Sequence, residues 1–514
     1  MSNDIQNEKI VYAPDVVGVG RMFMIALKVP SEAPDVTVTM PEGMAMFDHT
    51  SPSPLSTGGI KGGAKSEIRR FYFRAFQPTE RAEIRFALPD GEVVVPVEVW
   101  SFEDLREYRT LKGVLLPRRW PLGRELPELK ERQTVTTQAE IEALKGNPGA
   151  APVWLEMSDD AIWAMQPDST IPRWHWVNLP HGCPVHGTEI YRKAPYYPWE
   201  KDTSTPWRWK IRCPVGGELY PSNDFANGDM TSGEFPDDGI GGGCPCNERK
   251  YGFIAEICQA YCHQMLRVAP ECAQGYLATG DLRYVHKALV AFCRLAVEYA
   301  YLATMTHHRH RNSVSQVERF GQGTFQEGPC LARSGFTVYC IDQPGYQMRL
   351  AEAYDRIFPA IDQVPDIIPF LRAKGYPVQT HEDVRRFIEE NLFAVWMQGS
   401  MDGACQSNEP YVQRGLARTA EVLNYAHGTD FMDWLYDGEG KMRVFVPNAF
   451  FRDGAPYEST GGYNGIHVSA LGPIIDSIEH LRGLRPDAYP ESQYPRLSQS
   501  RRYRNVFDFD MDTV

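Results

Sequence analysis

The spacing of apolar residues changes along this chain, and that change constrains the fold more than any other feature. Residues 8–100 contain segments in which apolar and polar residues alternate, as in "AEIRFALPDGEVVVPVEVW" (82–100). A period of two residues puts successive side chains on opposite faces of a β-strand, and "PDGE" is typical of a hairpin turn. We therefore expect a β-sandwich of roughly 100 residues in this part.

Beyond residue 251 apolar residues recur with the 3.6-residue period of an α-helix. The first stripe consists of Ile254, Cys258, Tyr261, Met265 and Val268. The tripeptide "TGD" (279–281) interrupts the pattern before a second stripe of the same kind. Further helices are expected at 346–358, 382–398, 411–426 and 466–483. Helix pairs joined by glycine-containing turns indicate an all-α second domain.

Residues 101–250 show neither period clearly and are rich in Trp, Pro and Gly, so we expect a connector and long loops there. The fold class predicted for the whole chain is multidomain α+β. Its predicted parts are an N-terminal β-sandwich domain (1–105), a connector and loop-rich start of the helical domain (106–250), the helical domain (251–490) and a tail (491–514).

Composition narrows the class of protein. The chain of 514 residues is 43% hydrophobic and 23% charged, which is typical of globular proteins. Its formal charge of −13 argues against binding along nucleic acid. No apolar run reaches about 18 residues, so no membrane span is expected. The start, "MSNDIQNEKIVYAPD", lacks the basic and apolar regions of a signal peptide.

Two similar segments, "GCPVHG" (182–187) and "RCPVGG" (212–217), are typical of the turns that hold a zinc ion. The candidate ligands are Cys183, His186 and Cys213. The second turn has Gly216 where a fourth ligand would stand. A tetrahedral structural zinc site would then need one of His181, Cys244 or Cys246. The alternatives are buried thiols in Pro/Gly turns, or a knuckle without its metal. The chain has eleven cysteines, and this odd number favours buried thiols and a single metal site over a framework of disulfides.

Two loops carry residues suited to acid–base chemistry. "YESTGGYN" (457–464) places Tyr463 after two glycines and just before a predicted helix. "QSNEPYVQRGLARTAEVL" (406–423) places Asn408 before another predicted helix. From the residues alone, a packing tyrosine and an asparagine that caps a helix are the alternatives.

Several segments in order resemble one family. They are "CPVGGELYPSNDF" (213–225), "KYGFIAEICQAY" (250–261), "GYLATGDLRYVHKALVAFCRLAVEY" (275–299), "YQMRLAEAYD" (346–355) and "YESTGGYN". Together they resemble the heparinase II/III-like polysaccharide lyases, over roughly residues 180–485. The resemblance implies an incomplete (α/α) toroid of helical hairpins, followed by antiparallel β-sheet domains. The chain stops at "FDFDMDTV", where those sheets would begin, so we expect a fragment or a member without that half.

The resemblance also implies a reaction, β-elimination at a uronic acid. The C5 carboxylate must be neutralised, a base must remove the C5 proton, and an acid must protonate the leaving sugar oxygen. Tyr463 matches the catalytic tyrosine of the family. Asn408, 55 residues upstream, matches the asparagine that neutralises the carboxylate.

The identity of the base stays open. Several relatives have a histidine directly after that asparagine, whereas this chain has Glu409, and Asn464 stands where some relatives have another histidine. Tyr463 would then act as both acid and base, or a histidine would come from the missing sheet domain. A carboxylate base would be repelled by an anionic substrate.

Five further residues are candidates for substrate binding. Arg309 and Arg311 belong to the basic cluster "HHRHRN" (307–312), and Arg414 follows Asn408 by six residues, near the start of the same predicted helix. Their guanidinium groups suit carboxylate or sulfate. The other two are Glu458 and His467, which flank Tyr463. The alternatives are a solvated loop for the basic cluster, a cap or supporting residue for Glu458, and a helix surface for His467.

The function predicted is that of a polysaccharide lyase acting on a uronate-containing glycan, with an acidic polysaccharide as its partner and no cofactor required for catalysis. The family resemblance implies a periplasmic or secreted protein. Two alternatives remain: a uronate C5-epimerase on the same fold, and a non-catalytic carbohydrate-binding protein.

Overall fold

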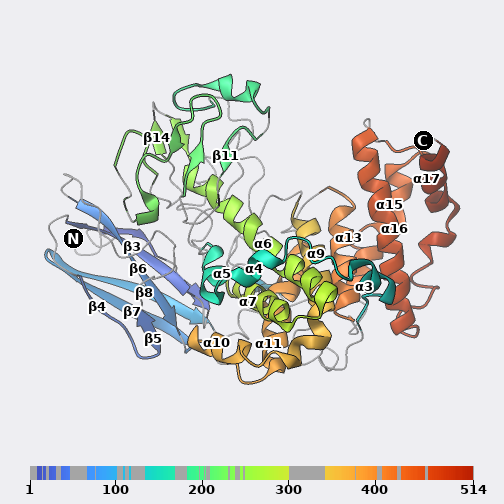
Figure 1. Cartoon of the computed structure of the whole chain (residues 1–514), viewed down its shortest axis with the longest axis horizontal. Coiled ribbons are helices and arrows are strands. Elements are labelled where there is room, and N and C mark those ends of the chain that lie inside the picture. The colour runs from blue at the N-terminus through green and yellow to red at the C-terminus, as the bar shows by residue number, and fades with distance from the viewer. Residues whose placement is uncertain are drawn as a thin grey trace. The chain divides into compact units, whose positions relative to one another are not determined.

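The computed structural model describes most of the chain (Figure 1). The described residues are 9–13, 16–18, 22–30, 36–46, 66–75, 77–100, 108–109, 115–116, 134–167, 182–195, 197–201, 203, 209–227, 229, 232–237, 244–246, 249–299, 342–376, 378–401, 408–424, 430–457 and 461–512. Two compact units share the chain. Unit 1 comprises Met1–Leu116, Ser158–Met265 and Val297–Tyr339, and unit 2 comprises Pro117–Met157, Leu266–Ala296 and Cys340–Val514. These bounds differ from the four parts expected from the sequence, because each unit is assembled from three separate segments.

Unit 1 begins with two four-stranded sheets. Their strands are β1 (Ile10–Tyr12), β2 (Val16–Gly18), β3 (Met22–Pro30), β4 (Thr37–Thr39), β5 (Met44–Met46), β6 (Ser66–Ala75), β7 (Thr79–Leu88) and β8 (Gly91–Trp100). One sheet has the order β1-β3-β6-β5 and the other β2-β8-β7-β4. All pairs are antiparallel except β2 with β8, which is parallel. A short pair, β9 (Tyr108–Arg109) and β10 (Leu115–Leu116), follows.

The two sheets share one hydrophobic core because their strands alternate as the sequence indicates. In β7, Ile84 and Phe86 are buried while Arg85 between them is more exposed. The ring of Phe86 lies 4.9 Å from that of Phe71 in the other sheet. Leu88 pairs with Gly91 across a two-residue turn, which confirms the hairpin predicted from "PDGE".

The rest of unit 1 is built from small sheets and the start of a long helix. These elements are α5 (Asp159–Met165), η2 (Thr188–Arg192), β11 (Glu200–Lys201), β12 (Ile211–Arg212), β13 (Leu219–Tyr220), η3 (Phe225–Asn227), β14 (Cys244–Cys246), β15 (Arg249–Tyr251) and the first half of α6 (Phe253–Thr279). Aromatic side chains of this part are core residues. Trp209 is fully buried, and its backbone N–H donates to the hydroxyl of Tyr261 on α6 at 3.2 Å.

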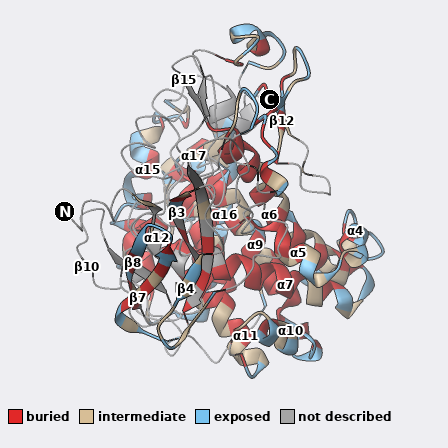
Figure 2. Cartoon of the chain, turned by 90° about the vertical axis from the view of Figure 1, so that its left-hand side faces the viewer, coloured by how far each residue is buried: buried red, intermediate tan, exposed pale blue. Residues whose placement is uncertain are grey.

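Unit 2 is helical in its described residues. Its elements are α3 (Gln138–Leu144), α4 (Pro152–Glu156), the rest of α6, α7 (Leu282–Tyr299, whose last three residues belong to unit 1), α9 (Gln343–Ile357), η5 (Phe358–Gln363), α10 (Ile367–Ala373), α11 (His381–Ile388), the π-helical turn η6 (Glu389–Phe393), α12 (Ala394–Met401), α13 (Tyr411–Val422), α14 (Asp430–Tyr436), α15 (Met442–Ala449), α16 (Gly461–Leu484), η7 (Leu497–Gln499) and α17 (Arg501–Asp512). Buried residues run along most of α6, α7 and α9 (Figure 2).

The helices expected from the 3.6-residue period are confirmed. "TGD" separates α6 from α7, and Gly280 there has a φ of +73°, which glycine adopts without strain. The helix expected over 382–398 differs in one respect, because the π-helical turn separates α11 from α12. In the predicted tail, α17 packs on α15, and the Tyr503 hydroxyl donates to the carbonyl of Met442.

Three helices of unit 2, α9, α13 and α16, pack side by side with α13 in the middle. Helix α13 contacts α9 on one side and α16 on another. Gly415 allows this close packing, because a Cβ atom there would lie only 3.0 Å from the Pro344 carbonyl oxygen of α9 and from the ring of Trp396 on α12. A larger residue at this position would push α13 outward.

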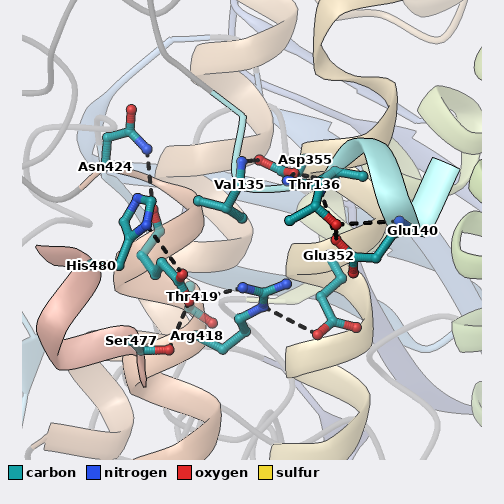
Figure 3. A network of polar contacts seen from close by, with 12 residues as sticks. Val135, Thr136, Glu140, Glu352, Asp355, Arg418, Thr419, Asn424, Ser477 and His480 are labelled. Carbon is teal, nitrogen blue, oxygen red and sulfur yellow. Dashed lines mark hydrogen bonds and ion pairs between the residues drawn. The ribbon is translucent and has the colours of Figure 1, made fainter. Parts of the chain in front are cut away.

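A chain of ionic and hydrogen-bonded contacts joins the same three helices (Figure 3). On α13, Arg418 donates to Glu352 of α9 at 3.1 Å and to Glu421 at 2.9 Å. Glu421 also accepts a hydrogen bond of 2.7 Å from the hydroxyl of Ser477 on α16. Nearby, Asp355 of α9 accepts the backbone N–H groups of Val135 and Thr136. Each buried carboxylate of this network, Glu421 and Asp355, therefore has hydrogen-bond donors that offset the cost of its burial.

Replacing Glu421 with glutamine is expected to destabilise unit 2 by about 1–3 kcal/mol, because the neutral amide keeps an acceptor oxygen but loses the negative charge that pairs with the half-buried Arg418. The residue is only 7% exposed, so water cannot take over these bonds. Chemical denaturation measures the change. The matched control is Glu439→Gln, whose side chain is 77% exposed and should shift stability by less than about 0.5 kcal/mol. Equal effects of the two substitutions would contradict a structural role for the network.

The predicted mixed α+β class is confirmed in its general form, since the described residues form many helices and small, mainly antiparallel sheets. Within these described residues, no helix has both the length and the apolar character needed to cross a bilayer.

Candidate functional site

Asn408 lies three residues before α13. It is half-buried, and its carbonyl oxygen accepts a hydrogen bond of 2.8 Å from the Tyr411 N–H. The N-cap of α13 is Pro410, so the alternative in which Asn408 itself caps the helix is not what the structure shows. None of the described residues forms a hydrogen bond with the side-chain amide of Asn408. That amide is therefore available to a ligand.

Arg414 lies in the first turn of the same helix, where its backbone N–H donates to Pro410 at 2.9 Å. Its side chain is half-buried, and among the described residues its Nε atom is buried with no hydrogen-bond partner. Arg418, one turn further along, differs because two carboxylates bind it. A half-buried guanidinium whose Nε has no partner among the described residues is a candidate for binding an anion.

Tyr463 is the third residue of α16, the helix that packs against α13. The two predicted catalytic residues therefore come from neighbouring helices of one unit, each at or just before a helix N-terminus. The side chain of Tyr463 lies outside the described residues, as do Glu458, Arg309 and Arg311.

His467 lies one turn after Tyr463 in α16. Its ring packs against Phe445 at 5.8 Å and Phe450 at 5.6 Å, both near α15, and the residue is half-buried. His467 therefore packs against aromatic rings instead of lying on an exposed helix surface, and its role in substrate binding stays a prediction.

The three predicted metal ligands of unit 1 come together. One ligand atom from each of Cys183, His186 and Cys213 lies within 4.8 Å of the other two. The Nδ1 atom of His186 is 3.9 Å from the sulfur of Cys183 and 3.5 Å from that of Cys213. Both cysteines are free thiols and only 1% exposed.

The backbone explains why these side chains converge. In the first turn, Cys183 and Gly187 exchange two hydrogen bonds of 2.9 Å. In the second, the N–H of Gly217 donates to the Cys213 carbonyl at 2.9 Å. Both glycines have positive φ angles, 55° at Gly187 and 81° at Gly217, which the tight turns require. The shared "CPV" segments therefore form two similar turns that face one ring nitrogen.

Burial raises the pKa of the Cys213 thiol to about 11, although hydrogen bonds from the backbone of Gly216 and Val215 oppose the shift. At neutral pH this thiol is therefore protonated unless a cation lies beside it. The turn supplies N–H groups that stabilise a thiolate, which is the form that binds metal.

Of the three residues expected to supply a fourth ligand, His181 and the side chains of Cys244 and Cys246 lie outside the described residues. Glu218 was not among the predicted ligands, and its Oε2 atom is 3.4 Å from Nδ1 of His186. Its signal was an acidic residue directly after the "GG" that closes the second turn.

Comparison with known proteins does not assign the chain to a family. A scan against protein-family models finds no match, and a search of curated proteins finds no similar sequence.

Proposed function

We propose that this protein is a polysaccharide lyase that cleaves a uronate-containing glycan by β-elimination. In this proposal the two sheets of unit 1 form a β-sandwich, and the helices of unit 2 form an incomplete (α/α) toroid. Support comes from the resemblance of residues 180–485 and from the packing of α9, α13 and α16 side by side. The observation that carries the proposal is the half-buried Arg414, whose Nε lacks a partner among the described residues.

The roles follow from the chemistry of elimination. Arg414 binds the C5 carboxylate of the uronate, because its guanidinium group can donate two parallel hydrogen bonds. Asn408 donates its amide N–H to the same carboxylate, which stabilises the negative charge that builds up when the C5 proton leaves. Tyr463 protonates the leaving sugar oxygen. Where it is also the base, it starts as the phenolate, removes the C5 proton and passes that same proton to the leaving oxygen. None of these steps requires a metal or an organic cofactor.

The test uses a panel of acidic polysaccharides, in which elimination creates a C4–C5 double bond that absorbs in the ultraviolet. We expect at least one uronate polymer to yield this product. Arg414→Gln should lower kcat/KM by about 10- to 150-fold, mainly through KM, because a hydrogen bond to a charged group contributes about 1.5–3 kcal/mol. Arg414→Lys, which keeps the charge, should recover part of the loss.

The matched control is Arg485→Gln, at an exposed arginine beyond the end of α16, which should leave turnover unchanged. Absence of an unsaturated product from every uronate polymer would contradict the lyase. Exchange of the C5 proton with solvent without chain cleavage would instead identify an epimerase, and binding without either reaction a carbohydrate-binding protein.

A further inference from the structure

The knuckle cluster of unit 1 carries an inference that is independent of the proposed lyase. We propose that Cys183, His186, Cys213 and Glu218 bind one Zn²⁺ ion, with the carboxylate of Glu218 as the fourth ligand. The four residues come from the two "CPV" turns, which lie about thirty residues apart in the sequence.

The first argument is the convergence on one nitrogen. Nδ1 of His186 has three neighbours: an oxygen of Glu218 at 3.4 Å, the sulfur of Cys213 at 3.5 Å and the sulfur of Cys183 at 3.9 Å. A ring nitrogen has one proton or one lone pair, so it forms one good hydrogen bond and not three. Tetrahedral zinc, with Zn–S of about 2.3 Å and Zn–N or Zn–O of about 2.0–2.2 Å, places its ligand atoms about 3.3–3.8 Å apart. The separations of 3.4 Å and 3.5 Å fall within this range, and the one of 3.9 Å lies just above it.

The second argument is the position of Glu218. In the first turn His186 follows Cys183 by three residues, and the equivalent residue of the second turn is Gly216. A Cβ atom added at Gly216 would overlap the carboxylate oxygens of Glu218 and Cε1 of His186. The carboxylate therefore occupies the space into which a ligand at position 216 would project.

The third argument is the state of that carboxylate. Its Oε2 atom is buried and has no hydrogen-bond partner among the described residues, although the side chain as a whole is 37% exposed. Such an oxygen is unfavourable unless a cation approaches it. Glu218 does not belong to the group of three ligand atoms within 4.8 Å of one another, so ligation also involves a rotation of this partly exposed side chain.

The donor atoms identify the metal. Two thiolates with an imidazole select zinc over calcium or magnesium, which take oxygen ligands. Four protein ligands leave no open position, so the site is structural rather than catalytic.

The structural role follows from what surrounds the cluster. The Tyr220 hydroxyl lies 3.5 Å from the sulfur of Cys183, and the Tyr220 ring stacks on Phe253 with centroids 4.9 Å apart. Phe253 is the first residue of α6. Zinc would therefore secure both turns against the start of this helix.

The test measures zinc in the full-length protein by elemental analysis, and its affinity by competition with a chromogenic chelator. We expect one zinc per chain in the wild type. Glu218→Gln should weaken binding by more than about tenfold, since even residues that only support a ligand contribute 10- to 100-fold. Cys213→Ser should reduce it further. The matched controls are Glu189→Gln, at an exposed glutamate near the first turn, and Cys272→Ser, at a buried thiol of α6 outside the cluster.

Cobalt substitution of the wild type gives a second measurement that does not depend on any variant folding. Co²⁺ should show the visible bands of tetrahedral coordination and a thiolate charge-transfer band, and added Zn²⁺ should remove both. A wild type that binds neither metal overturns the site. Wild-type zinc affinity in Glu218→Gln overturns the assignment of the fourth ligand. Neither result bears on the lyase, because Asn408, Arg414 and Tyr463, which carry its proposed chemistry, all belong to unit 2.

Discussion

Replacing Tyr463 with phenylalanine is expected to lower kcat on a uronate polymer by about 10²- to 10⁴-fold, the contribution of one acid–base group. The substitution removes only the hydroxyl, so the leaving sugar oxygen loses its proton donor while the ring remains. The initial rate of formation of the unsaturated product measures the effect. Elimination needs this proton at the moment the C4–O bond breaks, so substrate binding should change much less than turnover.

The control for this substitution is Tyr457→Phe. Tyr457 is exposed, lies six residues upstream and packs against Phe451, so the loss of its hydroxyl should affect neither turnover nor the unfolding midpoint. If Tyr463→Phe retains the turnover of the wild type, the phenol is not the acid, and Tyr463 returns to the role of a packing residue.

Replacing Asn408 with alanine is expected to lower kcat by about 10²- to 10³-fold, the usual cost of losing one donor to a developing negative charge. The amide donates without titrating, so it stabilises the C5 carbanion more than the ground-state carboxylate. Asn408→Asp should be at least as damaging, because a second negative charge would face the substrate. Single-turnover rates with saturating polymer measure the chemical step directly.

The matched control is Asn448→Ala, at an exposed asparagine of α15, with no expected effect. A result confined to KM in Asn408→Ala would show that the amide only binds substrate. Equal losses in Asn408→Ala and Asn448→Ala would point to a general loss of stability instead.

Local patterns predicted the elements of the fold well where one face of an element is buried. The strand β7 alternates in sequence and in burial, and the two-residue turn before Gly91 was readable from "PDGE". The helices α6, α7, α9, α13 and α16 were likewise predicted from their apolar stripes. These elements follow from local sequence because burial of one face is repeated at every turn or every second residue.

Other elements were missed or altered. The short helix α3 lies in the segment expected to be a connector, although Thr137 and Glu140 form the capping box that marks its start. A capping box of this kind is a local sequence signal for the start of a helix. The π-helical turn at Glu389–Phe393 has no comparable local signal, because its extra residue is stabilised by tertiary packing.

The candidate site residues also include some that local sequence predicts and some that depend on tertiary packing. The spacing of Cys183, His186 and Cys213 predicted their convergence. Glu218 was not predicted, because it follows Cys213 by five residues and approaches through a side chain rather than through the regular turn. The availability of Arg414 depends on which carboxylates fold around it, and no local pattern shows that two of them bind Arg418 instead.

The π-helical turn also marks where this chain can change in length. Glu389 is fully buried there and accepts a hydrogen bond of 2.8 Å from the Tyr354 hydroxyl. A π-helical turn holds one more residue than an α-helical turn within the same helix. Removing one residue from it would restore α-helical hydrogen bonding and leave the orientation of α12 nearly unchanged, so Trp396 would stay beside Gly415. Removing Val395 from α12 itself would instead rotate Trp396 by about 100° around the helix axis, because regular α-helix has no extra residue to absorb the loss. Single-residue deletions are therefore compatible with the π-helical turn and incompatible with the α-helical residues that follow it.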